Sequence, residues 1–371
     1  MKATRSIRII TSLSIAVVAI SAISWLGLGQ VSGAINRIDV FGSLSKRPDK
    51  PNTALNYLLV GSDTRVGLTK EQSKLLRVGT TKSAAGARSD TMLLVHISKS
   101  RDKATIISIP RDSLVTIPSH QSPIYKDRTV AAARGKINAA YAWGGAPLLI
   151  QTVEQETGVR IDHYIEIGFA GFAGMVDALG GIQVCTKKDI NDPKSHLILS
   201  AGIHTLDGIE ALKYVRTRDF DGMGDLGRMQ RQQQFMSAVL RKVTSTGVLL
   251  NPIKLVNFFN AAIATVQTDT QLNQSDLITL AKQLKNLSAS KVRTLTIPLG
   301  NSNGFVPGLG SVVIWDKVLA PDLFARLRAD LPLVNEVTPS PSASSTASAT
   351  PTVIDKFKTR TADENPCGAL K

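Results

Sequence analysis

Apolar and polar positions are grouped along the chain into blocks that predict strands first and helices later. Residues 55–60 form a short apolar run, and residues 91–98 and 104–110 form two more, each with the length of a strand. The last two are separated only by the charged turn 99–103, and so short a link predicts an antiparallel hairpin. We therefore expect three strands, of which the second and third are paired.

Helical patterns follow, with glycines and capping residues at their ends. The first covers residues 136–157 and is broken at Gly144-Gly145. Asp207 has the position of an N-cap for another, from residue 208 to about 214. Further helical patterns cover 172–179, 229–245, 252–266, 275–287 and 321–330, and further strands are expected at 161–169, 182–185 and 292–298.

The N-terminus carries an apolar run, residues 9–28, which follows three basic residues within positions 1–8. Twenty helical residues cover about 30 Å, the thickness of a bilayer core. The basic residues in front favour a cytoplasmic N-terminus. A cleaved signal peptide is the alternative, with small residues at 31–34, but its apolar core is normally only about 7–15 residues long. We therefore expect a single-pass protein of the cell membrane whose remaining chain lies outside the cytoplasm.

The rest of the chain divides by composition. Residues 29–53 are mostly polar with two prolines and are expected to be a spacer. Residues 54–336 hold the strand and helix patterns and form the folded domain. Residues 337–352 are rich in Ser, Thr, Ala and Pro and predict a disordered linker, which leads to a tail at 353–371.

The net charge of the chain limits the classes of partner that we expect. The formal net charge of +15 is spread over the chain, which favours an anionic partner such as lipid head groups, an anionic polymer or nucleic acid. Aromatic residues make up only 5%, and no arginine-aromatic interleaving of the kind that stacks bases occurs. Nucleic acid is therefore not expected as a partner.

The chain has two cysteines, Cys185 and Cys367, and neither belongs to a metal-binding pattern. In a domain outside the membrane they can form a disulfide that fixes the tail to the core. Two unpaired thiols are the alternative, and both readings stay open.

The segment 214–235 is the densest run of polar chemistry, with four arginines, three aspartates and four glutamines. Arg216 and Arg218 share one face if their segment is extended. Arg228, Arg231 and Gln232 share one face if the following residues are helical. Glycines between the two pairs predict a loop that carries Asp225 and two other aspartates. The arrangement suits a polyanion, because the planar guanidinium group matches phosphate oxygens two at a time. A solvated charged surface is the alternative.

A second polar group is expected at one end of the hairpin. Pairing Ser98 with Lys103 places Asp90 opposite Arg111. Asp63 follows the first strand and reaches the same rim if that strand is parallel to the third. Two carboxylates that leave room for water and phosphate oxygens suit Mg²⁺. Simple ion pairing at a sheet edge is the alternative for these residues, with their neighbours Arg65, Arg88 and Asp112.

Several common motifs are absent or out of context. No phosphate-binding loop of the G-x-x-x-x-G-K-[ST] type occurs, and the five histidines lack the spacing of a zinc site. The G-x-G-x-x-G match at 222–227 has no acidic residue about 20 positions later. The serine-hydrolase pattern at 300–304 is not followed by a helix, so it is expected to be a polar turn.

Taken together, these segments resemble the LytR-CpsA-Psr family of bacterial cell-envelope proteins. The matching segments occur in the family's order within residues 56–235: they are 58–65, 88–92, 108–112, 136–141, 214–218, 224–228 and 231–234. The resemblance implies an α/β domain whose central mixed sheet is flanked by helices that enclose an apolar groove for a polyprenyl chain, preceded by one transmembrane helix.

The resemblance also implies an activity. Family members transfer a glycopolymer from a polyprenyl-pyrophosphate carrier to peptidoglycan through a phosphodiester bond, with Mg²⁺, or alternatively Mn²⁺, at the pyrophosphate. Which glycopolymer moves, for example teichoic acid or arabinogalactan, stays open, as does the oligomeric state. Phosphoryl transfer depends mostly on positioning and charge neutralisation, in keeping with many arginines and few nucleophiles.

The family's roles carry over to residues of this sequence. The metal ligands would be Asp63 and Asp90. The catalytic group would be Arg111, Arg216, Arg218, Arg228 and Arg231, with Asp225 as the candidate base. The substrate-binding group would be Arg65, Arg88, Lys136, Asn138 and Gln232. Two other functions stay open: a hydrolase that cleaves polyprenyl pyrophosphate with water, and a non-catalytic lipid-binding or regulatory membrane protein.

Overall fold

The structure, a computed structural model, describes residues 36–78, 89–125, 127–245, 266–273, 287–337 and 352–364, together with residues 276, 279, 280, 283 and 367. The following predicted segments lie outside the described residues: the anchor at 9–28, the helical pattern at 252–266 except for its last residue, most of the pattern at 275–287, and the linker at 337–352 except for its two end residues. In the part that is described, no helix has the length and apolar character of a membrane span.

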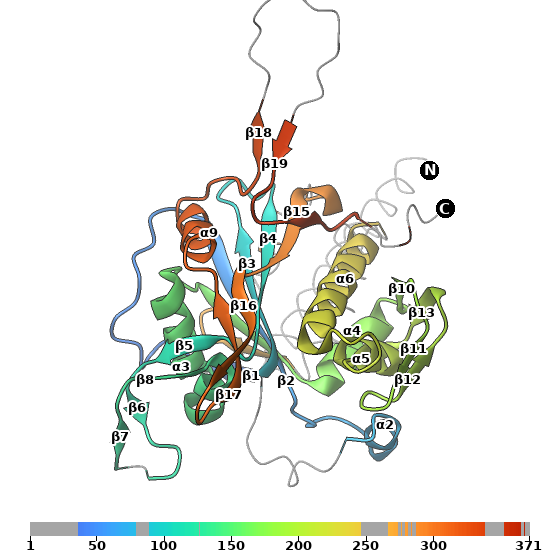
Figure 1. The fold of residues 1–371 in the computed structure, drawn as a ribbon, viewed down its shortest axis with the longest axis horizontal. Helices are drawn as coiled ribbons and strands as arrows, with labels where there is room; N and C mark the ends of the chain where they lie inside the picture. The colour runs from blue at the N-terminus through green and yellow to red at the C-terminus, as the bar shows by residue number, and fades with distance from the viewer. Residues whose placement is uncertain are drawn as a thin grey trace, which may run out of the picture.

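A mixed β-sheet of eight strands forms the centre of the described fold (Figure 1). In spatial order its strands are β1 (Asn36–Ile38), β14 (Val266–Asp269), β9 (His163–Ile167), β2 (Leu55–Ser62), β3 (Ser89–Ile97), β4 (Ala104–Ile109), β15 (Val292–Thr296) and β20 (Arg360–Thr361). β3 is antiparallel to β2 and β4, whereas β9 is parallel to β2 and β15 is parallel to β4. The expected α/β class with a mixed central sheet is therefore confirmed.

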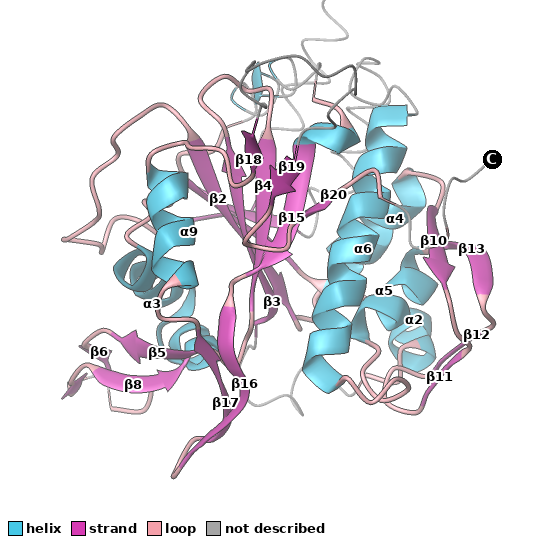
Figure 2. Cartoon of the chain, turned by 45° about the horizontal axis from the view of Figure 1, so that its top comes forward, coloured by secondary structure: helices cyan, strands magenta, loops and turns pink. Residues whose placement is uncertain are grey.

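Helices cover both faces of this sheet (Figure 2). They are α3 (Ile137–Thr157) and α9 (Leu319–Arg328) on one side, and α4 (Phe169–Ala178), α5 (Gly208–Arg216) and α6 (Gly224–Ser245) on the other. Successive side chains of a strand point to opposite faces. Leu94 and Ile107 accordingly pack in the core that includes α3 and α9, while Leu93 and Ile106 pack in the core that includes residues of α6.

Smaller elements surround the two helical layers. Two-stranded antiparallel sheets are formed by β5 (Leu114–Ile117) with β8 (Ala133–Lys136), β6 (His120–Gln121) with β7 (Thr129–Val130), β10 (Ile182–Thr186) with β13 (Gly202–Leu206), β11 (Ile190–Asp192) with β12 (Leu197–Leu199), β16 (Leu299–Val306) with β17 (Gly310–Trp315), and β18 (Asn335–Val337) with β19 (Thr352–Ile354). α2 (Lys70–Leu75) and the 3₁₀ turn η2 (Ala289–Lys291) complete the described elements. The expected polar turn at 300–304 is therefore wrong, because these residues belong to β16.

The register of the β3–β4 hairpin is the one predicted. The backbone N–H of Ser98 donates to the carbonyl of Lys103 over 3.0 Å, and Met92 lies opposite Ile109. Because β2 and β4 are both antiparallel to β3, their carboxyl ends lie at the same edge of the sheet. Asp63, Asp90 and Arg111 therefore come from one edge.

Two helix boundaries also agree with their local signals. The Oδ1 atom of Asp207 accepts the backbone N–H of Glu210 over 2.8 Å, so Asp207 caps α5 as expected. α3 is interrupted at Gly145, whose φ of 62° and ψ of −154° no helix contains. Two other expectations were wrong: α6 begins at Gly224 instead of residue 229, and Arg216 ends α5 instead of lying on an extended segment.

The N-terminal spacer is part of the domain from β1 onward. β1 pairs with β14, and Val40 and Phe41 are buried in the main core. Arg47 pairs with the buried Glu154 of α3 at 2.7 Å. The expected domain start at residue 54 is therefore too late.

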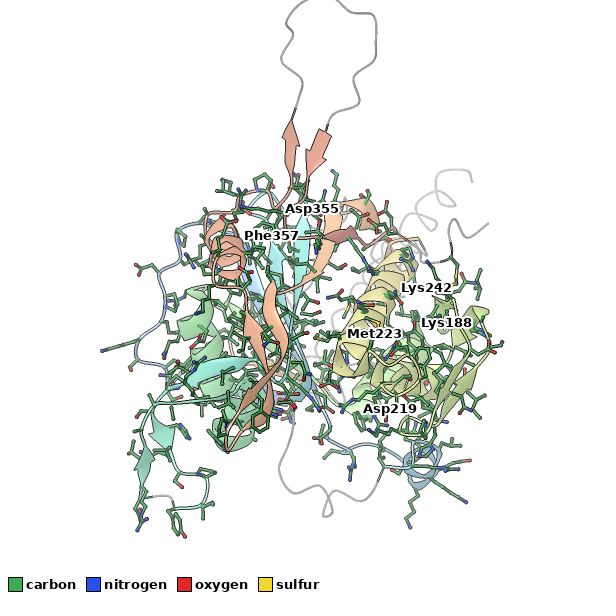
Figure 3. All side chains as sticks on the ribbon, in the orientation of Figure 1. Lys188, Asp219, Met223, Lys242, Asp355 and Phe357 are labelled. Atoms are coloured by element: carbon green, nitrogen blue, oxygen red, sulfur yellow. A yellow bond between two sulfur atoms is a disulfide. The ribbon has the colours of Figure 1, made fainter. Side chains whose placement is uncertain are left out.

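The C-terminal tail is also packed on the domain. Phe357 is buried in the core that contains α9, and Figure 3 shows it close to that helix. β20 then extends the sheet beside β15, and Ala362 is fully buried. Of the two alternatives for the cysteines the structure has the disulfide, with Cys185 and Cys367 joined at a Cα–Cα distance of 6.1 Å.

Candidate functional site

A cavity of about 300 Å³ lies between the sheet and the helical layer of α4, α5 and α6. Its inner wall is apolar, with side chains contributed by β2, β3 and β9 as well as by the three helices. These side chains are Leu59, Leu93, Ile167, Phe169, Phe172, Leu212, Val215, Phe235 and Met236. Apolar walls favour a hydrocarbon ligand, because water leaves both surfaces on binding.

One edge of the same cavity is charged. Asp63 follows β2, Asp90 lies near the start of β3, and Arg216 and Arg218 come from the end of α5 and the residues after it. Arg228 and Gln232 reach the cavity from α6, and Lys194 also lines it. The cavity therefore has the form of an apolar hollow with a cationic and acidic rim, which suits an amphipathic ligand with an anionic head.

Ion pairs join this rim to Arg111 and Asp225, which do not line the cavity themselves. Asp90 Oδ1 lies 2.6 Å from Arg111 Nη1 and 3.7 Å from Arg218 Nη2. Asp225, in the first turn of α6, lies 3.0 Å from Arg111 Nε and 3.4 Å from Arg228 Nη2. It also lies 3.5 Å from Arg218 Nε. Two carboxylates thus separate three guanidinium groups that would otherwise repel one another.

The pKa values reflect the same proximity. Burial lowers the pKa of Arg216, and Arg218 and Arg65 lower it further, whereas Asp90 and Asp63 act to raise it. For Arg111, burial alone acts to lower the pKa, but the carboxylates of Asp225, Asp90 and Asp112 outweigh it and raise that pKa. Arg216 is thus less compensated by carboxylates than Arg111, which favours an anion beside Arg216.

Several guanidinium nitrogens of the rim lack an acceptor within the described residues. Arg228 is only 2% exposed, yet its Nε and Nη1 atoms make no hydrogen bond there, and the same holds for Nη1 of Arg216. A buried donor without a partner costs about 1–3 kcal/mol, more when it is charged. Phosphate oxygens placed among these donors would satisfy them, so the rim has the properties of a phosphate site.

The loop that carries Arg218 is held by a residue that local sequence patterns did not reveal. Asp192 is 1% exposed, and its Oδ2 accepts the backbone N–H groups of Arg218 and Asp219 over 2.5 and 2.8 Å. Its Oδ1 accepts those of Lys194 and Ser195, each over 2.8 Å. Burial alone acts to raise the pKa of Asp192, but these backbone donors lower it to about 2. Asp192 therefore fixes the position of Arg218.

Other predicted site residues lie outside the cavity wall. Lys136 pairs with Asp112 at 3.2 Å, and the backbone N–H of Asn138 donates to the Arg111 carbonyl over 3.1 Å. Asp112 in turn lies 3.4 Å from Arg111 Nε, so both residues are connected to Arg111 and neither lines the cavity. Arg231 donates to Asp221 and to the carbonyl of Thr217, and it lines a different cavity.

Two further predicted substrate-binding residues are Arg88 and Gln232. Arg88 lies outside the described residues. Gln232 lines the cavity, and its amide donates to the Thr91 hydroxyl over 2.9 Å.

The residues fit a magnesium ion only as part of a complex with substrate. Asp63 and Asp90 line the same cavity. Among the described residues no group of three or more carboxylate, histidine or cysteine side chains is arranged to hold a metal ion. Mg²⁺ is commonly bound by one or two carboxylates together with water and substrate phosphates, so this donor set suits that ion.

Comparisons with known proteins agree with the geometry. Residues 32–312 match the family described as LytR_cpsA_psr. The chain is 38% identical over 295 residues to the probable cell wall biosynthesis protein LcpB of Corynebacterium glutamicum, an alignment that covers 79% of this chain and 65% of LcpB. It is 35% identical over 208 residues to the polyisoprenyl-teichoic acid–peptidoglycan teichoic acid transferase TagT of Bacillus subtilis, which covers 54% of this chain and 56% of TagT.

A solved structure supports the same relationship. The structure described as TagT bound to LI-WTA aligns with a TM-score of 0.58 and 26% identity, covering 80% of this chain and 99% of that one. The chain therefore shares its fold with that protein. The alignments with LcpB and TagT cover about two thirds or less of the full length of these two relatives.

Proposed function

The chain belongs to the LytR-CpsA-Psr family, and from this premise we propose that it is a membrane-anchored phosphotransferase that moves a glycopolymer from a polyprenyl-pyrophosphate carrier onto peptidoglycan. The proposal rests mainly on one observation: a single cavity has both an apolar interior and an arginine-rich rim. A polyprenyl pyrophosphate has the same two parts, a hydrocarbon chain and a dianionic or more highly charged head. The name of TagT, a teichoic acid transferase to peptidoglycan, supports the same reaction class.

In the proposed reaction an acceptor hydroxyl of peptidoglycan attacks the phosphorus next to the glycan. A new phosphorus–oxygen bond forms, the bridging phosphorus–oxygen bond breaks, and polyprenyl monophosphate leaves with the bonding electrons. Arg216, Arg218 and Arg228 bind the two phosphates and neutralise charge as it develops on the leaving group. Asp225, which Arg111 and Arg228 hold in place, is our candidate to accept the proton of the hydroxyl.

The metal ligands in this proposal are Asp63 and Asp90, with Mg²⁺ as the ion and Mn²⁺ as the alternative. The bound ion would supply further neutralisation of the pyrophosphate charge. Asp90 also pairs with Arg111 at 2.6 Å, so the same carboxylate would contact both the ion and that arginine.

Membrane anchoring belongs to the same proposal. The apolar run at 9–28 would hold the domain beside the bilayer that contains the polyprenyl carrier. Full-length chain in the membrane fraction, with the domain digested by protease added from outside, supports it. A chain recovered in the soluble fraction contradicts it.

The test of the activity uses a labelled lipid-linked glycan, isolated peptidoglycan and the full-length chain in detergent. The double variant Arg111→Ala with Arg228→Ala should lose at least about 1,000-fold in turnover, because each phosphate-binding donor of this kind contributes about 10²–10³. Arg326→Ala is the matched control, since Arg326 pairs only with Asp322 of its own helix among the described carboxylates. Unchanged turnover in the double variant would refute the site.

A further inference from the structure

A second and larger cavity, of about 590 Å³, lies on the opposite face of α6 from the first. Arg228, Gln232 and Phe235 line the first cavity, whereas Gln230 and Gln234 line the second, as the helical period requires. The remaining walls come from β10 and the residues after it, from Tyr214 and the residues 220–223, from β15, and from the C-terminal segment 360–364. The proposed reaction at the first cavity does not use this one.

The wall of the second cavity is partly polar and partly apolar, and it carries cations that have no carboxylate partner among the described residues. Lys187, Lys188 and Arg360 line it, and none of them has a carboxylate within ion-pair distance among the described residues. The side-chain amides of Gln230 and Gln234 make no hydrogen bond within the described part of the chain. Amides and cations that are exposed together in a hollow have capacity for sugar hydroxyls and for an anionic group.

The acidic residues of this cavity are already engaged. Asp221 pairs with Arg231 at 2.5 Å, and Oε1 of Glu364 accepts the backbone N–H of Thr361 over 3.1 Å. The side chain of Arg231 is held by the Thr217 carbonyl and lies 4.8 Å from the ring of Phe220. Arg231 neutralises Asp221. The three other cations of the wall outnumber its remaining carboxylate, that of Glu364, so the local potential is positive.

The C-terminal segment forms part of the cavity as a fixed wall. β20 pairs with β15, and Arg241 Nη1 donates to the Ala362 carbonyl over 2.7 Å. Three residues beyond this segment, Cys367 forms the disulfide with Cys185 of β10, and Cys185 itself lines the cavity. Because strand pairing and a covalent bond hold this wall, the backbone that carries Arg360 is already ordered. Ligand binding therefore loses little backbone entropy there.

One end of the second cavity lies at the start of α6, the helix that carries Asp225 and Arg228 of the proposed reaction centre. Its residues include Met223 and Gly227, at the start of α6, where Asp225 and Arg228 lie on the other face (Met223 and Lys188 are labelled in Figure 3). From Gly227 to Ser237 it follows α6 over about 15 Å, at 1.5 Å per residue. A chain molecule seated along it would have one end at the start of α6.

We propose that this second cavity is a binding site for an anionic glycan. Gln230 and Gln234 would bind sugar hydroxyls, and Lys187, Lys188 and Arg360 would bind carboxylate or phosphate groups along the chain. The chemistry of the wall indicates an anionic glycan as the ligand. The two candidate sources of that glycan are the peptidoglycan acceptor and the glycan of the donor, and this choice of sources rests on the proposed function.

The experiment measures binding of two probes to the full-length chain in detergent by isothermal titration calorimetry. One probe is soluble peptidoglycan strands, and the other is the glycopolymer cleaved from its lipid. The double charge reversal Lys187→Glu with Lys188→Glu should lower the affinity for the probe that binds by at least about 10-fold, which corresponds to about 1.4 kcal/mol. The double variant Gln230→Ala with Gln234→Ala should also lower this affinity, although it leaves the charge unchanged. Lys99→Glu, an exposed lysine of the β3–β4 turn, is the control.

Weakened binding of peptidoglycan strands supports the site with the acceptor as ligand, and weakened binding of the glycopolymer supports it with the donor glycan. If both probes bind the two double variants as they bind the wild type, or if Lys99→Glu weakens binding equally, the proposal is overturned. Release of polyprenyl phosphate from the donor is measured in parallel. If the wild type releases no polyprenyl phosphate, the proposed function is contradicted, while the binding results still decide whether the glycan site exists.

Discussion

Replacing Asp192 by asparagine tests how the phosphate rim is positioned. The two carboxylate oxygens of Asp192 accept four backbone N–H groups, two of them from Arg218 and Asp219. In asparagine one oxygen becomes an NH₂ group, which must face two N–H donors. Asp192→Asn therefore loses two charge-assisted hydrogen bonds at nearly unchanged volume, and the loop that carries Arg218 has to move.

The pKa of Asp192 gives the size of the effect. An ordinary aspartate has a pKa of 3.8, and backbone donors lower that of the buried Asp192 to about 2, although its burial acts to raise it. A difference of about 1.8 in pKa corresponds to about 2.5 kcal/mol of folding free energy. Because the folded-state pKa is the lower one, this stability is fully present above about pH 5 and is lost as the pH falls from about 4 towards 2.

Urea unfolding at pH 7 should therefore show Asp192→Asn to be less stable by about 2–3 kcal/mol, with the difference shrinking at pH 3. Turnover should fall by about 100-fold, since a displacement of about 1 Å in a positioning group can cost that much. Asp207→Asn is the matched control, because asparagine is as good an N-cap as aspartate and Asp207 is exposed. Equal stability of both variants, or an Asp192→Asn deficit that does not change with pH, would refute the reasoning.

Four further outcomes follow from the same structure. Arg228→Lys keeps the charge but loses the planar fork, so turnover should fall by about 10–100-fold with unchanged thermal stability; wild-type turnover would contradict this. Met236→Asp places a charge in the apolar hollow and should weaken binding of polyprenyl phosphate by at least about 30-fold in a tryptophan-fluorescence or calorimetric titration, whereas unchanged affinity would exclude the hollow as the lipid site. Cys185→Ser with Cys367→Ser opens a link across 182 residues and should cost about 2–4 kcal/mol in urea unfolding; no change in midpoint would show that the disulfide does not stabilise the fold. Chelation with EDTA should abolish turnover and Mg²⁺ should restore it, while full activity in EDTA would remove the metal role of Asp63 and Asp90.

The features that the sequence predicted correctly have causes within a few residues. The charged turn 99–103 allows only one tight hairpin, and its register then brings Asp90 to Arg111 without knowledge of the rest of the fold. Asp207 caps α5 because a carboxylate before the first helical turn meets free backbone donors. The break in α3 falls at Gly145, where the chain takes a positive φ.

The features that were missed depend on distant partners. Asp192 acts on backbone donors 26 and 27 positions away, which no local pattern shows. The tail is buried because β20 pairs with β15 at the edge of the sheet and Phe357 packs in the main core. Gly227 suggested a flexible loop, but it lies inside α6, where a Cβ atom would come within 2.8 Å of the Asp221 carboxylate.

The most direct test of the account follows each phosphate of the donor separately. A lipid-linked glycan labelled in the phosphate next to the glycan, or in the phosphate next to the lipid, is incubated with the full-length chain and peptidoglycan. The account predicts that the first label becomes bound to peptidoglycan while the second leaves as polyprenyl monophosphate in equal amount. Recovery of the first label as a soluble glycan phosphate, with none on peptidoglycan, would contradict it.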